Sequence, residues 1–414
     1  MRALVAIGLV CAAGVAGAAE LTVGPYVQDV REDGFTIAYE TDVDAAGTVV
    51  ADGHKVATRG TRHEARVDGL KPGTRVKYRL LVDGRERAAS EVATAASDGP
   101  LTFVVYGDTR DGAEIAGDLS RAILAEQPDL ALHTGDIVRS GDDLVAWRSF
   151  FAEEAPLIST VPVYYAIGNH ELYRDPGGDN ARRFLVPPDD GRTRRYYSFR
   201  RGAVKFIALD GNGNYDAQAD WLKDQLESAT HDGTRHVFVF VHQSPFSMGG
   251  HCGNAVPEAR WVSLFEQYQV RAVFAGHDHC YQRLERNGVR YFVSGGGGAQ
   301  VYPERESCAR YDKAARRVYQ AVHHYLRVRV VGDEVDLAAI TLDKGQAPLD
   351  RVHFDRTKVV PSGEAPPLVD DRLVESPLAA NLVDNVSHRW PLAAGGLLLF
   401  LLVRGLRRRG RSLT

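Results

Sequence analysis

The sequence lacks a strong charge imbalance. Its 414 residues include 50 Lys and Arg against 54 Asp and Glu, which gives a formal net charge of -4. So small a net charge argues against a nucleic-acid-binding protein, which usually carries a basic excess. Apolar residues make up 44% and charged residues 25% of the chain, as is typical of a globular protein. The length predicts two or three domains with a large buried core.

The C-terminal region lacks an apolar run of membrane-spanning length, which is about 20 residues. Residues 392–403 are apolar without interruption, and a basic cluster follows them at Arg404, Arg407, Arg408, Arg409 and Arg411. This segment resembles the C-terminal sorting tails of exported bacterial proteins, and its cations would stay in the cytoplasm. A basic disordered end is the alternative. We predict a Pro- and Asp-rich linker over 346–390 and a tail over 391–414, with residues 391–411 as a candidate membrane tether.

The N-terminal region has one basic residue, Arg2, before an apolar stretch that runs to Val15. Small residues follow at positions 16–19. This pattern predicts a secretory signal peptide over residues 1–19, cleaved after Ala18 or Ala19. A buried first helix is the alternative. The signal predicts an exported protein that is periplasmic, cell-surface or secreted.

The sequence has only four cysteines, and Cys11 would leave with the signal peptide. Export permits disulfides, and the odd number that remains leaves one thiol over. Cys252 and Cys308 lie in Gly-rich or polar segments, so we predict that they pair. Cys280 follows a candidate metal ligand directly, and we predict a free thiol there.

The periodicity of the chain changes near residue 100. Residues 21–95 alternate apolar and polar positions in short runs, which predicts a small β-sandwich. From residue 100 to about 345, apolar strand-like runs alternate with helical segments such as 115–126 and 216–228, which predicts an α/β domain. Residues 325–330 and 334–341 predict a hairpin that closes this domain. No internal repeat is present.

Most apolar runs of the α/β region end in a side chain that can bind a metal. Ligand sites of α/β proteins lie outside the carboxyl ends of the strands, so these side chains can converge at one edge. A glycine before most of them allows a sharp turn and a close approach to the site. The candidate ligands are Asp108, Asp136, Asn169, His242, His277 and His279.

Two carboxylates, an amide oxygen and three imidazoles form a mixed oxygen and nitrogen ligand set. Such a set suits Fe, Zn or Mn better than Ca or Mg alone. Six ligands exceed what one open catalytic ion usually takes, so we predict two ions bridged by a carboxylate. A pair of this kind clamps the attacking and leaving oxygens of a phosphoryl group.

The order of these motifs resembles the calcineurin-like metallophosphoesterase family, in its purple-acid-phosphatase-like branch. Residues 276–283 match the G-H-x-H-x-Y-x-R motif of that family closely. Gly24-Pro25-Tyr26-Val27-Gln28 resembles the start of the purple phosphatase N-terminal domain. Residues 69–79 resemble a late-strand signature of fibronectin type III domains. The resemblance implies an α/β fold with four αββα layers, preceded by a fibronectin type III-like sandwich.

The resemblance also implies a role for each site residue. Asp136 would bridge two ions; Asn169, His242 and His277 would hold the second ion, and Asp108 and His279 the first. His170 would protonate the leaving oxygen or stabilise the transition state. A metal-bound hydroxide would attack the phosphorus in line.

Two positions depart from the family pattern. The family places a His two residues after the first Asp, where this chain has Arg110, and purple phosphatases have a Tyr where it has Arg139. A replacement ligand such as Glu114, a weak solvent-completed site, or an Arg110–phosphate contact could each explain the missing ligand. Arg suits the last role because its planar fork pairs with phosphate oxygens, so we predict that Arg110 is catalytic.

The sequence thus predicts an exported hydrolase of phosphate esters, with monoesters favoured over diesters. A binding module built on an inactive phosphoesterase fold is the alternative of another class. The run Gly295–Gly298 could cradle a phosphate through its backbone N–H groups or form a tight turn beneath the site.

Overall fold

The computed structural model describes residues 18–188, 194–308, 316–342 and 347–355. Three parallel strands at one end of a six-stranded sheet supply the first candidate ligands. Its order is β18-β17-β16-β6-β7-β8, in which β6, β7 and β8 are parallel and the other neighbours antiparallel. These strands are β6 (Leu101–Tyr106), β7 (Leu130–His133), β8 (Val163–Tyr165), β16 (His324–Val331), β17 (Glu334–Thr341) and β18 (Asp350–Asp355).

A seven-stranded sheet supplies the histidine ligands. Its order is β15-β13-β14-β12-β11-β10-β9, and β10, β11, β12 and β14 run parallel. Antiparallel strands complete its two edges. The strands are β9 (Tyr197–Arg201), β10 (Val204–Ala208), β11 (His236–Phe240), β12 (Ala272–Ala275), β13 (Tyr281–Arg286), β14 (Val289–Ser294) and β15 (Arg316–Gln320).

The two sheets pack face to face around an aromatic core. Phe103 of β6 meets Phe206, Phe238 and Phe274 of the other sheet edge-on, with ring centroids 5.1, 5.2 and 5.9 Å apart. Because these strands are buried on both faces, they read in sequence as continuous apolar runs. The inner faces therefore form one core, in which Leu132, Phe240 and Phe292 are also fully buried.

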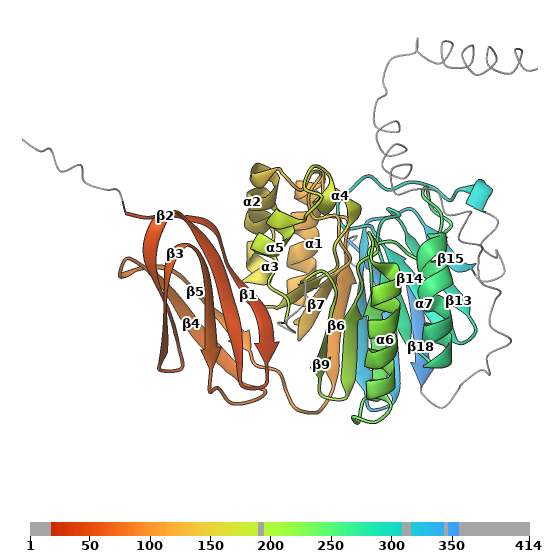
Figure 1. Cartoon of the computed structure of the whole chain (residues 1–414), viewed down its shortest axis with the longest axis horizontal. Helices are drawn as coiled ribbons and strands as arrows, with labels where there is room; N and C mark the ends of the chain where they lie inside the picture. The colour runs from red at the N-terminus through yellow and green to blue at the C-terminus, as the bar shows by residue number, and fades with distance from the viewer. Residues whose placement is uncertain (1–17, 189–193, 309–315, 343–346, 356–414) are drawn as a thin grey trace, which may run out of the picture. The chain divides into compact units, whose positions relative to one another are not determined.

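Helices cover the outer face of each sheet. The six-stranded sheet packs against α1 (Ala113–Ala125), α2 (Leu144–Glu153) and α3 (Ala155–Ile158). The seven-stranded sheet packs against α6 (Tyr215–Ala229) and α7 (Ala255–Gln267). Figure 1 shows the two helical layers on opposite sides of the sheets. The predicted α/β fold of four αββα layers is confirmed.

The C-terminal boundary of this domain differs from the prediction. The predicted hairpin forms as β16 and β17, but it does not close the sheet. β18 adds a further strand from residues that we assigned to the 346–390 linker. Phe354 is the one buried residue of this strand, so its alternation was too short to stand out against the Pro- and Asp-rich background.

Residues 21–93 form a five-stranded antiparallel sheet. Its strands are β1 (Leu21–Arg31), β2 (Gly34–Ala51), β3 (His54–Asp68), β4 (Arg75–Val82) and β5 (Arg85–Ala93). The first half of β2 pairs with β1 and its second half with β4, while β3 follows it along both halves. A register shift between Glu40 and Ala45 separates the halves, and their apolar side chains share one core. The resemblance to fibronectin type III domains stays a prediction.

Buried polar contacts join this sheet to the α/β domain. The Tyr26 hydroxyl donates to the Phe184 carbonyl at 2.7 Å, and Gln28 Nε2 donates to the Val163 carbonyl at 3.1 Å. All described residues accordingly belong to one compact unit. Within residues 18–355, as far as the structure describes them, no helix has the length and apolar character that a membrane span requires. The predicted signal peptide up to Gly17 and the predicted tail lie outside the described residues.

Glu154, between α2 and α3, makes the stability of this domain depend on pH. Its carboxyl group is fully buried and accepts the Tyr106 hydroxyl at 2.7 Å, and burial raises its pKa to about 8. Between these two pKa values the folded protein keeps the proton on Glu154, whereas the unfolded carboxyl, with a pKa near 4.5, has already lost it.

The free energy of unfolding should consequently fall by a few kcal/mol as pH rises from about 4.5 to 8. Glu154→Gln keeps the Tyr106 hydrogen bond without titrating. Urea unfolding of both proteins across this range should show a steeper decline for the wild type, and equal slopes would contradict the assignment.

Candidate metal centre

The candidate ligands sit where strands end and the backbone turns sharply. Asp108 follows β6, Asp136 follows β7 and His277 follows β12, and their φ angles are 58°, 57° and 69°. The left-handed region costs a non-glycine residue of order 1–3 kcal/mol and persists where surrounding contacts impose it. Each turn directs its side chain across the carboxyl edge of the sheets rather than along the strand.

Glycines directly before two of the candidate ligands, Asn169 and His277, allow close packing at the site. A Cβ atom at Gly168 would lie 2.2 Å from Asp136 Oδ1, and one at Gly276 would lie 2.3 Å from Asp108 Oδ2. Any larger residue at either position would displace a carboxylate. The close approach expected from the glycine-containing motifs is therefore present at both positions.

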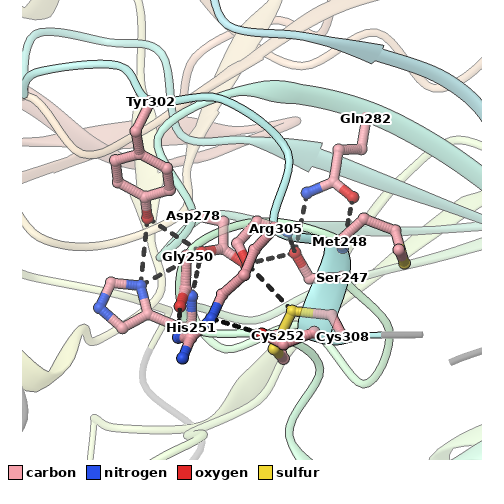
Figure 2. The surroundings of a disulfide bond; sticks show 12 residues. Ser247, Met248, Gly250, His251, Cys252, Asp278, Gln282, Tyr302, Arg305 and Cys308 are labelled. Carbon is pink, nitrogen blue, oxygen red and sulfur yellow. Dashed lines mark hydrogen bonds and ion pairs between the residues drawn. A yellow bond between two sulfur atoms is a disulfide. The ribbon is translucent and has the colours of Figure 1, made fainter. Parts of the chain in front are cut away.

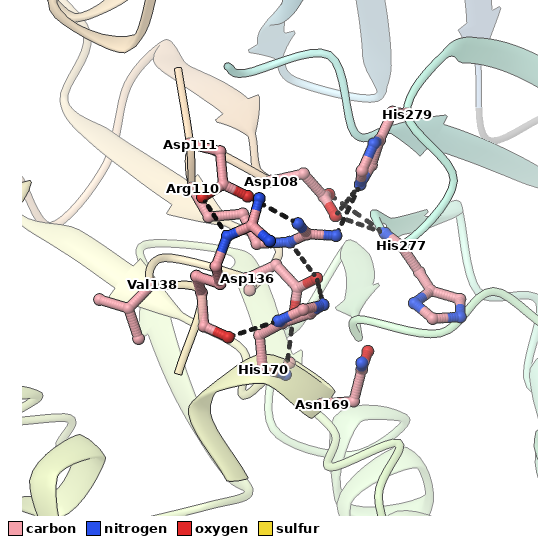
Figure 3. Close-up of polar contacts among 12 residues, drawn as sticks. Asp108, Arg110, Asp111, Asp136, Val138, Asn169, His170, His277 and His279 are labelled. Atoms are coloured by element: carbon pink, nitrogen blue, oxygen red, sulfur yellow. Dashed lines mark hydrogen bonds and ion pairs between the residues drawn. The ribbon is translucent and has the colours of Figure 1, made fainter. Parts of the chain in front are cut away.

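Asp136 belongs to two groups of converging donor atoms. One group contains Asp136, His242 and His277, and the other contains Asp108, Asp136 and His279, with the donor atoms of each group within 4.8 Å of one another. Asn169, the first residue of α4 (Asn169–Leu172), adds its Oδ1 3.0 Å from His242 Nε2. The structure thus brings all six predicted ligands together. Figure 3 shows Asp108, Asp136, Asn169, His277 and His279 of this set.

Backbone carbonyls orient two of the histidines. His242 Nδ1 lies 2.9 Å from the Thr134 carbonyl, and His279 Nδ1 lies 2.9 Å from the Gln300 carbonyl. Each carbonyl accepts the Nδ1 proton, so the lone pair of Nε2 faces the centre. His242 Nε2 then lies 3.2 Å from Asp136 Oδ1 and 3.2 Å from His277 Nδ1.

The electrostatics of these residues suit a cation. Burial raises the pKa of Asp108 well above its ordinary value, and the neighbouring Asp136 raises it further. Burial also lowers the pKa of His242 and of His277, and burial with Arg110 lowers that of His279 to about 4. Neutral imidazoles beside buried carboxylates are the donor set that Zn, Fe or Mn binds. The residues therefore fit a metal centre.

Glu171 ties together the loops that carry Asp136 and Asn169. Its Oε2 accepts the backbone N–H groups of Asp136 at 2.9 Å and Gly168 at 2.8 Å. Its Oε1 accepts those of Ile137 at 2.7 Å and Val138 at 3.2 Å. The sequence analysis missed this role, although an acidic residue two positions after Asn169 was a usable signal for a helix N-terminal cap.

His251 also lies at the centre and was not predicted. Its ring centroid is 4.1 Å from that of His277, and its Nδ1 lies 3.2 Å from Asp278 Oδ1 and 3.1 Å from the Tyr302 hydroxyl. The next residue, Cys252, forms a disulfide with Cys308, and Cys280 is a buried free thiol, which confirms both cysteine predictions. Figure 2 shows this loop around the disulfide. His251 does not follow a strand, and the sequence analysis looked for ligands only at the ends of apolar runs.

Arg110 and Arg139, the two arginines at positions that depart from the family pattern, occupy different environments. The Arg110 side chain is 4% exposed and contacts Asp136, Asp111 and His279. The Arg139 side chain is 57% exposed, and its Nε donates to Asp111 at 2.7 Å. Glu114, the suggested replacement ligand, is exposed in the first turn of α1.

The run Gly295–Gly298 packs beneath Asp108. The Gly297 N–H donates to the Gly107 carbonyl at 2.9 Å, and the Gly296 carbonyl accepts the His324 N–H at 3.2 Å. A Cβ at Gly295 would lie 2.8 Å from Asp108 Oδ2. Of the two predicted roles, these contacts support the tight turn.

A sequence model of calcineurin-like phosphoesterases matches residues 101–281, the segment that carries every residue of this centre. Residues 101–281 form a calcineurin-like phosphoesterase domain. The chain is 29% identical to an uncharacterised protein of Mycobacterium tuberculosis over 265 residues, which are 53% of this chain and 50% of that one. It is 28% identical to purple acid phosphatase 21 of Arabidopsis thaliana over 260 residues, 58% of this chain and 59% of the relative.

The structure of a purple acid phosphatase from yellow lupin seeds is similar to the phosphoesterase fold seen here. The TM-score is 0.70 at 17% identity, and the match covers 80% of this chain and 74% of the lupin chain. At this identity the similarity concerns the fold. The chain spans between half and three fifths of the length of the two sequence relatives.

The four hydrogen bonds to Glu171 predict a large effect of its removal. Glu171→Ala leaves four buried N–H donors without their acceptor, so the free energy of unfolding should fall by about 2–5 kcal/mol. Metal affinity should fall about 10–100-fold, because the loops of Asp136 and Asn169 lose their common anchor. Urea unfolding and zinc titration measure the two effects.

Glu227→Ala, on the exposed face of α6, is the matched control and should change neither quantity. A Glu171→Ala protein as stable as this control would show that Glu171 does not hold the loops.

Proposed function

We propose that this protein is a metal-dependent hydrolase of phosphate esters, with monoesters as the favoured substrates. The observation that carries the proposal is the pair of donor groups that share Asp136 beside His170, at the carboxyl edge of a phosphoesterase fold. Mixed oxygen and nitrogen donors favour Fe, Zn or Mn. The sequence analysis predicted two ions for these groups, and the number of ions stays a prediction.

Metal ions bound there would activate water and neutralise charge on the phosphoryl oxygens. The residues of the chain supply the remaining functions. Asp136, Asn169, His242 and His277 fix the position of the centre, and Glu171 fixes the loops beneath it. Backbone carbonyls hold His242 and His279 in the neutral tautomer that a ligand needs.

His170 is placed to transfer a proton. Its Nδ1 lies 2.7 Å from the Arg139 carbonyl, which accepts the Nδ1 proton and fixes the ring. The other nitrogen, Nε2, lies 3.8 Å from Asp136 Oδ2, on the side of the candidate ligands (Figure 3). His170 Nε2 would hold the proton that passes to the leaving oxygen.

A positive charge near His170 would favour monoesters. Arg139, whose backbone carbonyl fixes His170, has an exposed side chain that pairs with Asp111 at 2.7 Å. A monoester dianion gains more from such a cation than a diester monoanion does. A phosphodiesterase on the same site is the alternative.

A binding module on an inactive phosphoesterase fold is the alternative from another class, and turnover separates the two. Zinc- or manganese-loaded protein should hydrolyse p-nitrophenyl phosphate faster than bis(p-nitrophenyl) phosphate. A chelator should abolish turnover, and the metal should restore it. Protein that holds metal but hydrolyses neither ester would overturn the enzymatic proposal.

Export is also part of the proposal. The Cys252–Cys308 disulfide belongs in an oxidising compartment, in agreement with the signal-like residues at the N-terminus. Ala19 is buried in the core of the N-terminal sheet, and its carbonyl accepts Arg87 Nη2 at 2.5 Å. These contacts favour cleavage after Ala18, which leaves Ala19 in the mature protein. Mass spectrometry of the exported protein would identify the first residue.

His170→Ala should keep its metal and lose turnover. General acid catalysis contributes about 10²–10⁴-fold, so hydrolysis of an alkyl phosphate should slow by that factor. A p-nitrophenolate leaving group needs no proton, so the defect should be much smaller for the aryl ester. Comparing kcat for both esters tests the role.

His231→Ala, in the exposed segment after α6, serves as the control for loss of a histidine. Equal losses of His170→Ala activity on both esters would argue that His170 positions the substrate or the loop instead of donating a proton.

A further inference from the structure

The Arg110 guanidinium lies inside one of the two donor groups. Its Nε is 3.2 Å from Asp136 Oδ2, and its Nη2 is 3.4 Å from His279 Nε2. Asp136 Oδ2 and His279 Nε2 are also the atoms with which an ion in the Asp108–Asp136–His279 group would be coordinated. Figure 3 shows the guanidinium between the two aspartates and His279.

Hydrogen bonding at these contacts is complementary. The Gln300 carbonyl takes the Nδ1 proton of His279, so His279 Nε2 is an acceptor for Arg110 Nη2. Asp136 Oδ2 is likewise an acceptor for Arg110 Nε. Guanidinium protons and a metal ion would compete for the same lone pairs, and arginine does not deprotonate in proteins.

In the other donor group, the proton donor at Asp136 is a neutral backbone N–H instead of a guanidinium: the His170 N–H donates to Asp136 Oδ1 at 3.2 Å. Asp136 Oδ1 faces His242 Nε2 at 3.2 Å, and His242 Nε2 faces Asn169 Oδ1 at 3.0 Å and His277 Nδ1 at 3.2 Å. The two oxygens of Asp136 are therefore divided: Oδ1 faces this donor group, and Oδ2 faces a guanidinium.

Acidic contacts hold Arg110 in place from its outer side. Arg110 Nη1 donates to Asp111 Oδ2 at 2.9 Å, while Arg139 Nε donates to Asp111 Oδ1 at 2.7 Å. The Arg110 backbone N–H also donates to the Asp136 carbonyl at 3.2 Å. All three guanidinium nitrogens thus have an acceptor, in a side chain that is 4% exposed.

One ion keeps the excess of charge at the centre small. A divalent ion and the Arg110 guanidinium would supply three positive charges against the two carboxylates of the donor groups, Asp108 and Asp136, because Asp111 also pairs with Arg139. A second divalent ion in the Asp108 group would touch the guanidinium and raise this excess by two charges in a buried site. Buried charge without a partner is strongly unfavourable.

We propose that this phosphoesterase domain binds a single metal ion, at Asp136, Asn169, His242 and His277, and that Arg110 supplies the second cation of the centre. Arg110 is then a positioning residue for Asp108, Asp136 and His279. This inference rests on the proposed function because both concern the same metal centre, but it predicts the number of bound ions and not the reaction. It replaces the predicted pair of ions by one ion and one guanidinium.

Metal stoichiometry tests the inference directly. Full-length protein is stripped with a chelator and titrated with Zn²⁺ against a chromophoric competitor, and elemental analysis then counts the tightly bound zinc. The wild type should bind one ion per chain. His279→Ala should keep that ion with an affinity within about threefold, whereas His242→Ala should lower the affinity on the order of 100-fold or more.

Substitution of Arg110 should open the second site. Arg110→His removes the guanidinium and adds an imidazole, so the count should rise to two, and Arg110→Lys should stay at one because the charge remains. Adding His279→Ala to Arg110→His should return the count to one. Circular dichroism verifies that each variant is folded.

Two tightly bound ions in the wild type would overturn the inference, and so would a large loss of zinc affinity in His279→Ala. Either result would leave the proposed hydrolase intact if the protein turns over phosphate esters. One bound ion without turnover would support the inference and remove the proposed hydrolase instead. Protein that binds no zinc, manganese or iron would contradict both.

Discussion

The buried carboxylate of Asp136 is the interaction on which the site depends. It is 1% exposed, and although burial raises its pKa, interactions with His242, His170 and Arg110 together outweigh burial and lower the pKa below its ordinary value. A buried charge persists only when its partners are fixed in place. Its backbone N–H is held by Glu171 and its side chain is approached by His242 and Arg110, so each neighbouring loop is positioned relative to this one group.

The fold makes this concentration of charge possible. Parallel strands in both sheets end at one edge, where polar side chains can leave the core without crossing it. The aromatic layer around Phe103 keeps the two sheets at a fixed spacing, and the left-handed turns at Asp108 and His277 aim their side chains across the gap. Stability of the core and geometry of the site therefore come from the same strands.

Much of this could be predicted from the sequence, because doubly buried strands leave continuous apolar runs and most of these runs end in a ligand-capable residue. The α/β fold and the convergence of the six ligands follow from that pattern. The contacts of Arg110 could not be predicted, since a guanidinium can point outward to phosphate or inward to Asp136. Glu171 and His251 act through backbone groups and a disulfide-linked loop, and β18 alternates over too few residues to be visible.

Anomalous diffraction from zinc-loaded crystals tests the centre most directly. The metal edge should give one strong peak, bounded by Asp136 Oδ1, Asn169 Oδ1, His242 Nε2 and His277 Nδ1, with the Arg110 guanidinium on the far side of Asp136. A second peak of similar height between Asp108 and His279, or no peak beside His242, would contradict this arrangement of one ion and one guanidinium around a buried aspartate.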